Sequence, residues 1–176
     1  MTESHPLVKL ARETIELYVR EGRRHDVPPD LPADLRRAAG AFVTLHRHGE
    51  LRGCIGTIQP TCASVVEEVI QNAISSATCD PRFPALDPSE LADLDVKVDV
   101  MCEPEPITST DQLDPKRYGL IVQSRTKPWK RGLLLPDLEG IDSVEKQVYW
   151  TRYHKAGISD PKEPVQMFRF EVQRLK

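Results

Sequence analysis

The chain has 176 residues, enough for one domain to bury a substantial hydrophobic core. Its content of 39% hydrophobic and 29% charged residues is that of an ordinary globular protein, and its net charge of −3 argues against a general attraction to nucleic acid or to anionic membranes. No apolar run reaches the ~18 residues that a membrane span requires, and the first residues lack signal-peptide character, so we expect a cytoplasmic protein with no membrane association.

The first predicted element is a helix. Apolar residues recur at helical spacing between positions 7 and 18, with Ser4 as the expected N-cap and Gly22 as the expected stop. The prolines and charged residues of 23–32 then predict an extended surface connector, because proline removes backbone donors and disfavours helix in the residue before it.

A hairpin and a second helix follow. Residues 41–58 predict two strands that turn around Gly49, which can adopt the positive φ that such turns often need. Residues 61–77 carry a broad apolar stripe, and Ser64 with Glu67 fits a capping box at the start of this helix.

The second half of the chain predicts more strands than helices. A loop at 80–83 leads to a single helical turn at 89–92, and alternating valines predict a half-buried strand at 96–101. After a proline-rich bend at 103–106, two apolar runs predict a second hairpin over 119–135.

A third helix and a closing strand complete the prediction. Asp142 and Glu145 are the expected caps of the helix, and Gly157 is its expected C-terminal residue. The alternation of residues 168–172 predicts a final strand.

These elements together predict an α+β fold. Two hairpins, at least two further strands and about three helices occur without regular βαβ alternation, which favours a largely antiparallel sheet. There is no internal repeat and no linker long enough to divide the chain, so we expect residues 1–176 to form a single domain.

The most unusual stretch is the run Leu51-Arg52-Gly53-Cys54-Ile55-Gly56. Glycine has no packing value in an apolar strand and costs about 0.5–1 kcal/mol relative to alanine, so something must need the room at Gly53 and Gly56. Either another backbone or a ligand comes close to these glycines. In both cases the Cys54 thiol lies at the point of approach.

With Thr57 and Ile58, residues 51–56 resemble the signature of the AMMECR domain family, known in prokaryotes as protein A of the AmmeMemoRadiSam system. Later blocks of the chain resemble the family in the same order: residues 80–83, 86, 90–91, 119–122, 132–136 and 155–158. The resemblance covers nearly the whole chain and implies a single α/β sandwich-like domain with a small second lobe at one end. It implies where a site lies and not which reaction takes place there.

Cys54 is the first candidate for a catalytic residue. Positive charge or local amides lower the pKa of a thiol, and Arg52 would share a face with Cys54 on a regular strand. The amides of Gly53 and Gly56 could bind an anion or a developing oxyanion. The alternative is structural, because a free cysteine often behaves as a small buried hydrophobe.

Asp80 and Arg82 form the second element of the candidate site. On a loop after a helix, the carboxylate could accept a proton and the guanidinium could bind a carboxylate or phosphate. Alternatively, the two residues form a clasp that only fixes the loop. The resemblance places Arg52, Cys54, Asp80 and Arg82 in its two strongest blocks.

Lys155 is a further substrate-binding candidate, because it matches a family block. Its plain explanation is that cations favour helix C-termini. The preceding His154 departs from the cysteine that the resemblance leads us to expect, and it would change the available base if this position faced the site.

Metal and cofactor sites are not predicted. The cysteines are too widely spaced for a CxxC redox pair or a zinc knuckle, and in a reducing cytosol we expect free thiols: Cys54, Cys62, Cys79 and Cys102. His46 and His48 could join Cys54 around zinc or iron, but they occupy a turn. Residues 53–56 fit neither Walker nor dinucleotide spacing.

The sequence therefore favours a pocket in which Cys54 acts on a small anionic substrate, in an enzyme or an enzyme component. The resemblance implies work with a radical S-adenosylmethionine protein and a Memo-like protein; this chain has no cysteine triplet for an iron–sulfur cluster, so radical chemistry would belong to the partner. The competing hypothesis is a non-catalytic binding or adaptor module for a protein or RNA, which would use the basic hairpin tip 125–131 with Trp129.

Overall fold

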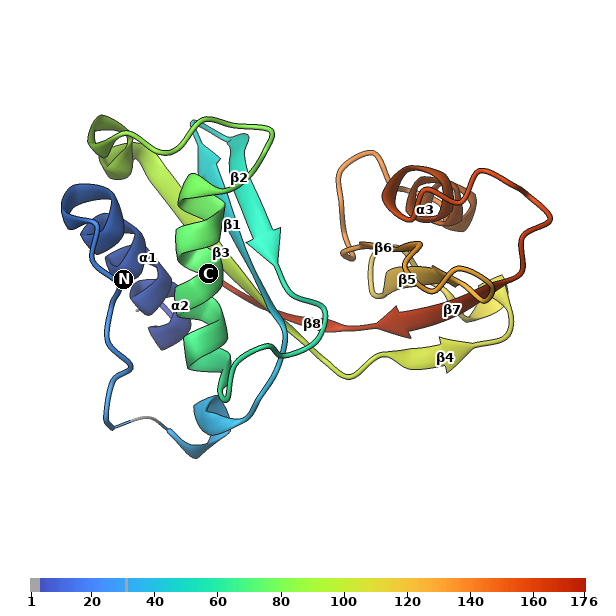
Figure 1. Cartoon of the computed structure of the whole chain (residues 1–176), viewed down its shortest axis with the longest axis horizontal. Helices are drawn as coiled ribbons and strands as arrows, with labels where there is room; N and C mark the ends of the chain where they lie inside the picture. The colour runs from blue at the N-terminus through green and yellow to red at the C-terminus, as the bar shows by residue number, and fades with distance from the viewer. Residues whose placement is uncertain (1–3, 31) are drawn as a thin grey trace. The chain divides into compact units, whose positions relative to one another are not determined.

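The structure of the chain is a computed structural model that describes residues 4–30 and 32–176 (Figure 1). Its contacts divide the chain into two compact units. Unit 1 comprises the residues up to Met101 together with Gln173–Lys176, and unit 2 comprises Cys102–Val172. Among the described residues, no helix is both long and apolar enough to cross a membrane.

Unit 1 is a four-stranded sheet with two helices on one face, as the left part of Figure 1 shows. The strand order is β2-β1-β3-β8, and β1 runs antiparallel to both β2 and β3. The elements of this unit are α1 (Pro6–Glu21), η1 (Ala33–Arg36), β1 (Ala41–Arg47), β2 (Glu50–Gly56), α2 (Val65–Thr78), η2 (Pro88–Asp93), β3 (Leu94–Met101) and β8 (Val172–Leu175).

The two long helices form where the sequence predicts them. Gly22 ends α1 in the left-handed conformation, but the N-cap is His5, whose Nδ1 accepts the amide hydrogen of Leu7; the prediction of Ser4 was wrong. The capping box of Ser64 and Glu67 begins α2, as predicted.

The core of unit 1 lies between these helices and the sheet. Alternate residues of β1 and β3 face the helices, and the valines and alanines of α2 pack on them. The buried strand residues are Ala41, Val43, Leu45, Val96, Val98 and Val100.

Unit 2 is a second antiparallel sheet, of order β4-β7-β5-β6, which contacts the helical segment α3–η4 mainly through β5 and β6. Its elements are β4 (Glu105–Ile107), η3 (Thr110–Gln112), β5 (Gly119–Ser124), β6 (Arg131–Leu134), α3 (Val144–Tyr149), η4 (Trp150–Lys155) and β7 (Val165–Phe170). The segment η4 is a π-helix.

Unit 2 departs from the sequence prediction in three places. The second half of the predicted bend at 103–106 lies in the short strand β4. The closing strand is interrupted at Glu171, so β7 and β8 belong to different sheets. The N-cap of α3 is Ser143, which accepts the amide hydrogen of Lys146, and not Asp142. Even so, the fold is α+β with antiparallel pairing, as predicted.

Candidate functional site

The signature glycines lie where helix α2 and strand β1 come close to strand β2. A Cβ atom on Gly53 would stand 2.4 Å from the carbonyl oxygen of Ser76 in α2, and one on Gly56 would stand 2.3 Å from the ring of Phe42. The absence of a side chain at Gly53 therefore lets the backbone of helix α2 come close. Of the two explanations that the sequence leaves open for this glycine, a neighbouring backbone or a ligand, the structure shows the first.

A polar side chain of α2 joins the two strands at this contact. The Ser76 hydroxyl donates to the carbonyl of Val43 at 2.7 Å and accepts the amide hydrogen of Ile55 at 2.9 Å. Ser76 is buried, so the hydroxyl satisfies two backbone groups that water does not reach. The helix thereby completes the hydrogen bonding of the hairpin.

The signature strand contains a bulge. Leu45 pairs with Gly53 whereas His46 pairs with Leu51, so Arg52 is the extra residue of β2. The expectation that Arg52 and Cys54 share a face assumed a regular strand, and this assumption was wrong.

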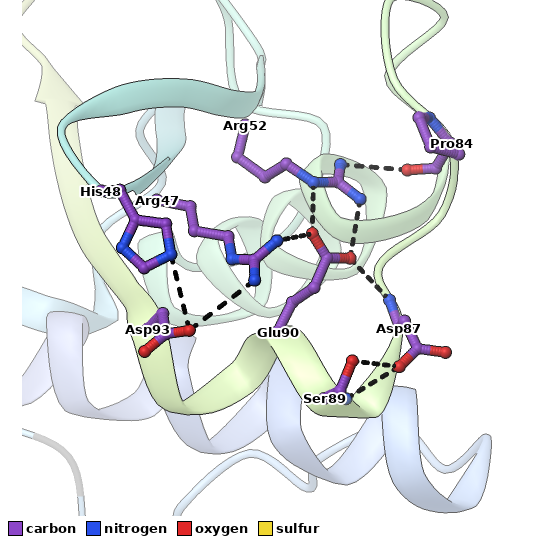
Figure 2. Close-up of polar contacts among 8 residues, drawn as sticks. All are labelled: Arg47, His48, Arg52, Pro84, Asp87, Ser89, Glu90 and Asp93. Carbon is purple, nitrogen blue, oxygen red and sulfur yellow. Dashed lines mark hydrogen bonds and ion pairs between the residues drawn. The ribbon is translucent and has the colours of Figure 1, made fainter.

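Arg52 is held by Glu90 of η2 (Figure 2). Its Nε and Nη2 atoms each donate to Glu90 at 2.9 Å, and its Nη1 donates to the carbonyl of Pro84 at 3.0 Å. Arg47 reaches the same carboxylate at 3.2 Å. Hydrogen bonding from Arg52, then from the Asp87 amide, and the charges of both arginines hold the pKa of Glu90 below its ordinary value. Since its guanidinium is committed to this carboxylate, Arg52 acts first as a positioning residue for the hairpin.

Asp80 connects the loop after α2 to the signature strand. The carboxylate is 4% exposed and accepts the amide hydrogen of Cys54 at 2.9 Å. It also accepts hydrogen bonds from the Arg82 side chain, from Nη2 at 2.7 Å and from Nε at 3.0 Å. The hydrogen bond from Arg82 is the largest of the effects that hold the pKa of Asp80 far below its ordinary value. A carboxylate this acidic is a poor proton acceptor at neutral pH, so the geometry favours a positioning role for Asp80.

The Cys54 thiol lies on the half-buried part of the strand, beside a hydroxyl. Its Sγ is 3.1 Å from Oγ1 of Thr44, the residue opposite it in β1. Burial raises the pKa of Cys54, while the Thr44 hydroxyl and the charge of Arg82 act in the opposite direction and only partly offset it. In the free protein at neutral pH, Cys54 is therefore a thiol, and the groups that would stabilise its thiolate are Thr44 and Arg82.

Arg82 is the most accessible cation of this group. Its side chain is 50% exposed, its guanidinium lies 5.5 Å from the centre of the Phe83 ring, and its Nη2 contacts the Cys54 carbonyl at 3.4 Å. Among the described residues its Nη1 has no hydrogen-bond partner, so this edge is free to bind an anion.

The remaining candidates lie elsewhere in the chain. Lys155 is the exposed last residue of η4 in unit 2, whereas the other candidates belong to unit 1. His154 packs its ring on Trp150, with the centroids 4.2 Å apart. The Nε2 atom of His48 lies 3.6 Å from a carboxylate oxygen of Asp93, and within the described ranges no group of three or more His, Cys, Asp or Glu side chains is placed to hold a metal.

Sequence reasoning missed two residues that matter here, Thr44 and Glu90. In a regular hairpin, counting back from the turn would place Val43 opposite Cys54. The bulge at Arg52 shifts the pairing by one residue, so Thr44 lies opposite Cys54 instead. Glu90 was predicted as part of a helical turn and of a family block, but its pairing with Arg52 spans 38 positions of the chain, which no local pattern reveals.

Comparison with known proteins places the chain in a family. The AMMECR1 family model matches residues 8–175. The chain belongs to the AMMECR1 family. The match includes nearly all described residues of both units.

Individual relatives agree with this assignment. A Thermotoga maritima protein described only as "Protein" is 49% identical over the whole of both chains. "Protein CA_C1420" of Clostridium acetobutylicum is 45% identical over 99% of this chain, which spans only 36% of that longer protein. The crystal structure of the uncharacterized protein PH0010 from Pyrococcus horikoshii superposes with a TM-score of 0.85 at 34% identity, covering 96% of this chain and 88% of that one.

Proposed function

We propose that this AMMECR1-family protein is an enzyme, or a component of one, that uses the Cys54 thiol on a small anionic substrate in the cytosol. The observation that carries the proposal is that the Cys54 thiol lies 3.1 Å from the Thr44 hydroxyl, while the half-exposed Arg82 guanidinium contacts the carbonyl of the same residue. A hydroxyl donor and a guanidinium are the groups that stabilise a thiolate, and an anionic substrate would bring Arg82 a second partner.

The other residues have supporting roles in this proposal. The Asp80 carboxylate accepts hydrogen bonds from both the Cys54 amide and the Arg82 guanidinium, so it fixes the nucleophile relative to the cation. Arg52 anchors the bulged strand through Glu90. The amides of Cys54 and Ile55 are already bound to Asp80 and Ser76, so an anion would rely on Arg82 more than on these backbone groups.

A thiol of raised pKa needs activation before it can react. Binding of substrate or of a partner protein would exclude water and strengthen the attraction between the thiolate and Arg82. The resemblance to the AmmeMemoRadiSam system suggests a radical S-adenosylmethionine protein and a Memo-like protein as such partners. Lys155 stays a candidate for contact with substrate or partner.

Alkylation of native protein tests the proposal. Anionic iodoacetate and neutral iodoacetamide are compared at Cys54 by mass spectrometry over a range of pH, with the exposed Cys79 and Cys102 as internal references. We expect Cys54 to react with an inflection above the ordinary thiol pKa and to favour iodoacetate more than the reference thiols do, because Arg82 attracts the carboxylate.

Two variants show whether Arg82 is responsible. Arg82→Gln should abolish the preference for iodoacetate and Arg82→Lys should retain part of it, while Arg24→Gln removes an exposed positive charge elsewhere in the same unit and should change nothing. A Cys54 that reacts only after unfolding would refute the nucleophile and leave a structural cysteine. A preference that survives in Arg82→Gln would refute the role of the guanidinium.

A further inference from the structure

Unit 2 carries a cluster of four aromatic rings, three exposed and one (Tyr153) half-buried, that the proposed cysteine site does not use. They are Tyr149, Trp150, Tyr153 and His154, here called the aromatic surface. The exposed fraction is 51% for Tyr149 and 43% for Trp150, which is high for large rings. Each ring contacts another of the group, with centroids 4.2–6.1 Å apart. The surface is thus a continuous patch of π-faces and ring edges.

The π-helix explains why these rings meet. In an α-helix, residues five apart point in different directions, because each residue turns the helix by about 100°. The wider π-turn, marked by the bond from the Ala156 amide to the Thr151 carbonyl at 2.9 Å, brings residues four and five apart onto one side. Tyr149 therefore contacts both Tyr153 at 5.2 Å and His154 at 5.4 Å.

Positive charge borders the aromatic surface at its C-terminal end. Lys155 directly follows His154 and is exposed. Strand β6 passes close by, since a Cβ on Gly132 would stand 2.3 Å from the backbone of Lys155 and of Ala156. Within the described residues neither Lys155 nor Lys130, two positions before Gly132, forms an ion pair.

The hairpin tip between β5 and β6 carries another exposed ring. Trp129 is 78% exposed, next to Lys130 in the tip between β5 and β6. At the other end of the aromatic surface, Glu145 precedes Tyr149 by one helical turn and would repel an anion. The charge thus changes sign along the surface, with the cations on the side of Lys155 and Lys130.

We propose that the aromatic surface binds single-stranded RNA. Bases stack on aromatic side chains irrespective of sequence, and lysines neutralise the phosphates between them. The hydroxyls of Tyr149 and Tyr153 have no hydrogen-bond partner among the described residues, so they are free to pair with ribose 2′-hydroxyls. A surface of rings and lysines suits this partner better than an acidic peptide, which offers charge but few planar groups. The binding is local and coexists with a net charge of −3 for the whole chain.

Tryptophan fluorescence of the full chain gives a direct test, because the protein has 2 tryptophans. In Trp129→Phe the emission comes from Trp150 alone, and titration with a single-stranded RNA of about 10 nucleotides should quench it as bases stack. We expect log affinity to fall against log salt with a slope of about −0.7 to −1.4, as for one or two neutralised phosphates on a single strand. Trp150→Ala should weaken binding of labelled RNA by roughly 5- to 150-fold, the range for loss of one stacking partner.

Matched controls separate this surface from unspecific attraction. Lys155→Ala should lower the salt slope by about 0.7, whereas Lys116→Ala, an equal loss of charge on the loop before β5, should leave it unchanged. Duplex RNA, whose bases are already stacked, and DNA of the same sequence, which lacks the 2′-hydroxyl, should bind more weakly.

Three results would overturn the proposal. One is wild-type RNA affinity in Trp150→Ala and Tyr149→Ala. Another is equal affinity for duplex RNA, which would indicate charge without stacking. The third is an absence of RNA binding combined with self-association that Trp150→Ala abolishes, which would assign the surface to a second copy of the chain. None of these variants touches Cys54, so their outcome is independent of the proposed thiol chemistry.

Discussion

Replacing Gly53 by alanine tests whether the signature glycine serves packing or a ligand. The added methyl group would lie 2.4 Å from the Ser76 carbonyl oxygen, whereas ordinary contacts begin near 3.4 Å, so helix α2 and strand β2 must separate by about 1 Å. The obstacle is backbone on both sides, and a change of rotamer cannot relieve it.

The magnitude follows from two opposing effects. Overpacking of this kind costs about 1–3 kcal/mol, and the upper end applies because the neighbour is backbone. Alanine also lowers the conformational entropy of the unfolded chain, which stabilises the folded protein by about 0.4–1 kcal/mol. We expect a net loss of about 2 kcal/mol in the free energy of unfolding, or about 4–8 °C in the melting temperature of a protein of this size.

Urea unfolding followed by circular dichroism measures this loss. Gly140→Ala is the comparison, since a Cβ there meets no atom within 4 Å and only the positive φ of +80° opposes it. That strain should cost about 1–2 kcal/mol. A Gly53→Ala protein with the wild-type midpoint and slope would refute the packing explanation, and the glycine would then have to serve a ligand.

Three further predictions follow from the hydrogen bonds around the site. Glu90→Gln should lose about 1–3 kcal/mol of unfolding free energy in urea, because it removes the negative charge that Arg47 and Arg52 share. Asp93→Asn, at a more exposed carboxylate, should lose less than about 1 kcal/mol, and equal losses in the two variants would contradict this reasoning. The depressed pKa of Asp80 adds stability that is present above the unfolded pKa of about 4 and is lost as the pH falls below it. Asp80→Asn should therefore flatten the dependence of unfolding free energy on pH below about 4, and an unchanged slope there would be inconsistent with this role. Thr44→Val removes a group that lowers the pKa of Cys54, so its alkylation profile should move to higher pH, and a profile that stays in place would argue against the contact.

The regular elements could be predicted from local patterns. The apolar stripe and capping box of α2, the stop of α1 at Gly22 and the two hairpins depend on residues close in sequence, and all of them form. Local reasoning failed where two adjacent residues compete, as with His5 and Ser4 at the cap of α1, and where a continuous apolar alternation passes from one sheet to the next at Glu171.

For the candidate site, the sequence indicated residues, and the structure shows which of them contact one another. The sequence indicated Arg52, Cys54, Asp80 and Arg82, and the structure joins three of them directly through the Asp80 carboxylate. It could not show that Arg52 is bound to Glu90, because a bulge turns the residue out of register and the partner is distant in the chain. The aromatic surface was missed for a similar reason, since it depends on a π-turn that α-helical spacing does not predict.

The return of the chain from unit 2 to unit 1 affects the order in which the protein can fold during synthesis. Strand β8 completes the first sheet beside β3, yet it follows every element of unit 2 in the sequence. While the ribosome makes residues 102–172, the outer edge of β3 is therefore exposed, and unpaired edges invite aggregation. A nascent chain that stalls before β8 carries an open sheet edge, and chaperones that recognise unpaired edges would bind this protein late in its translation.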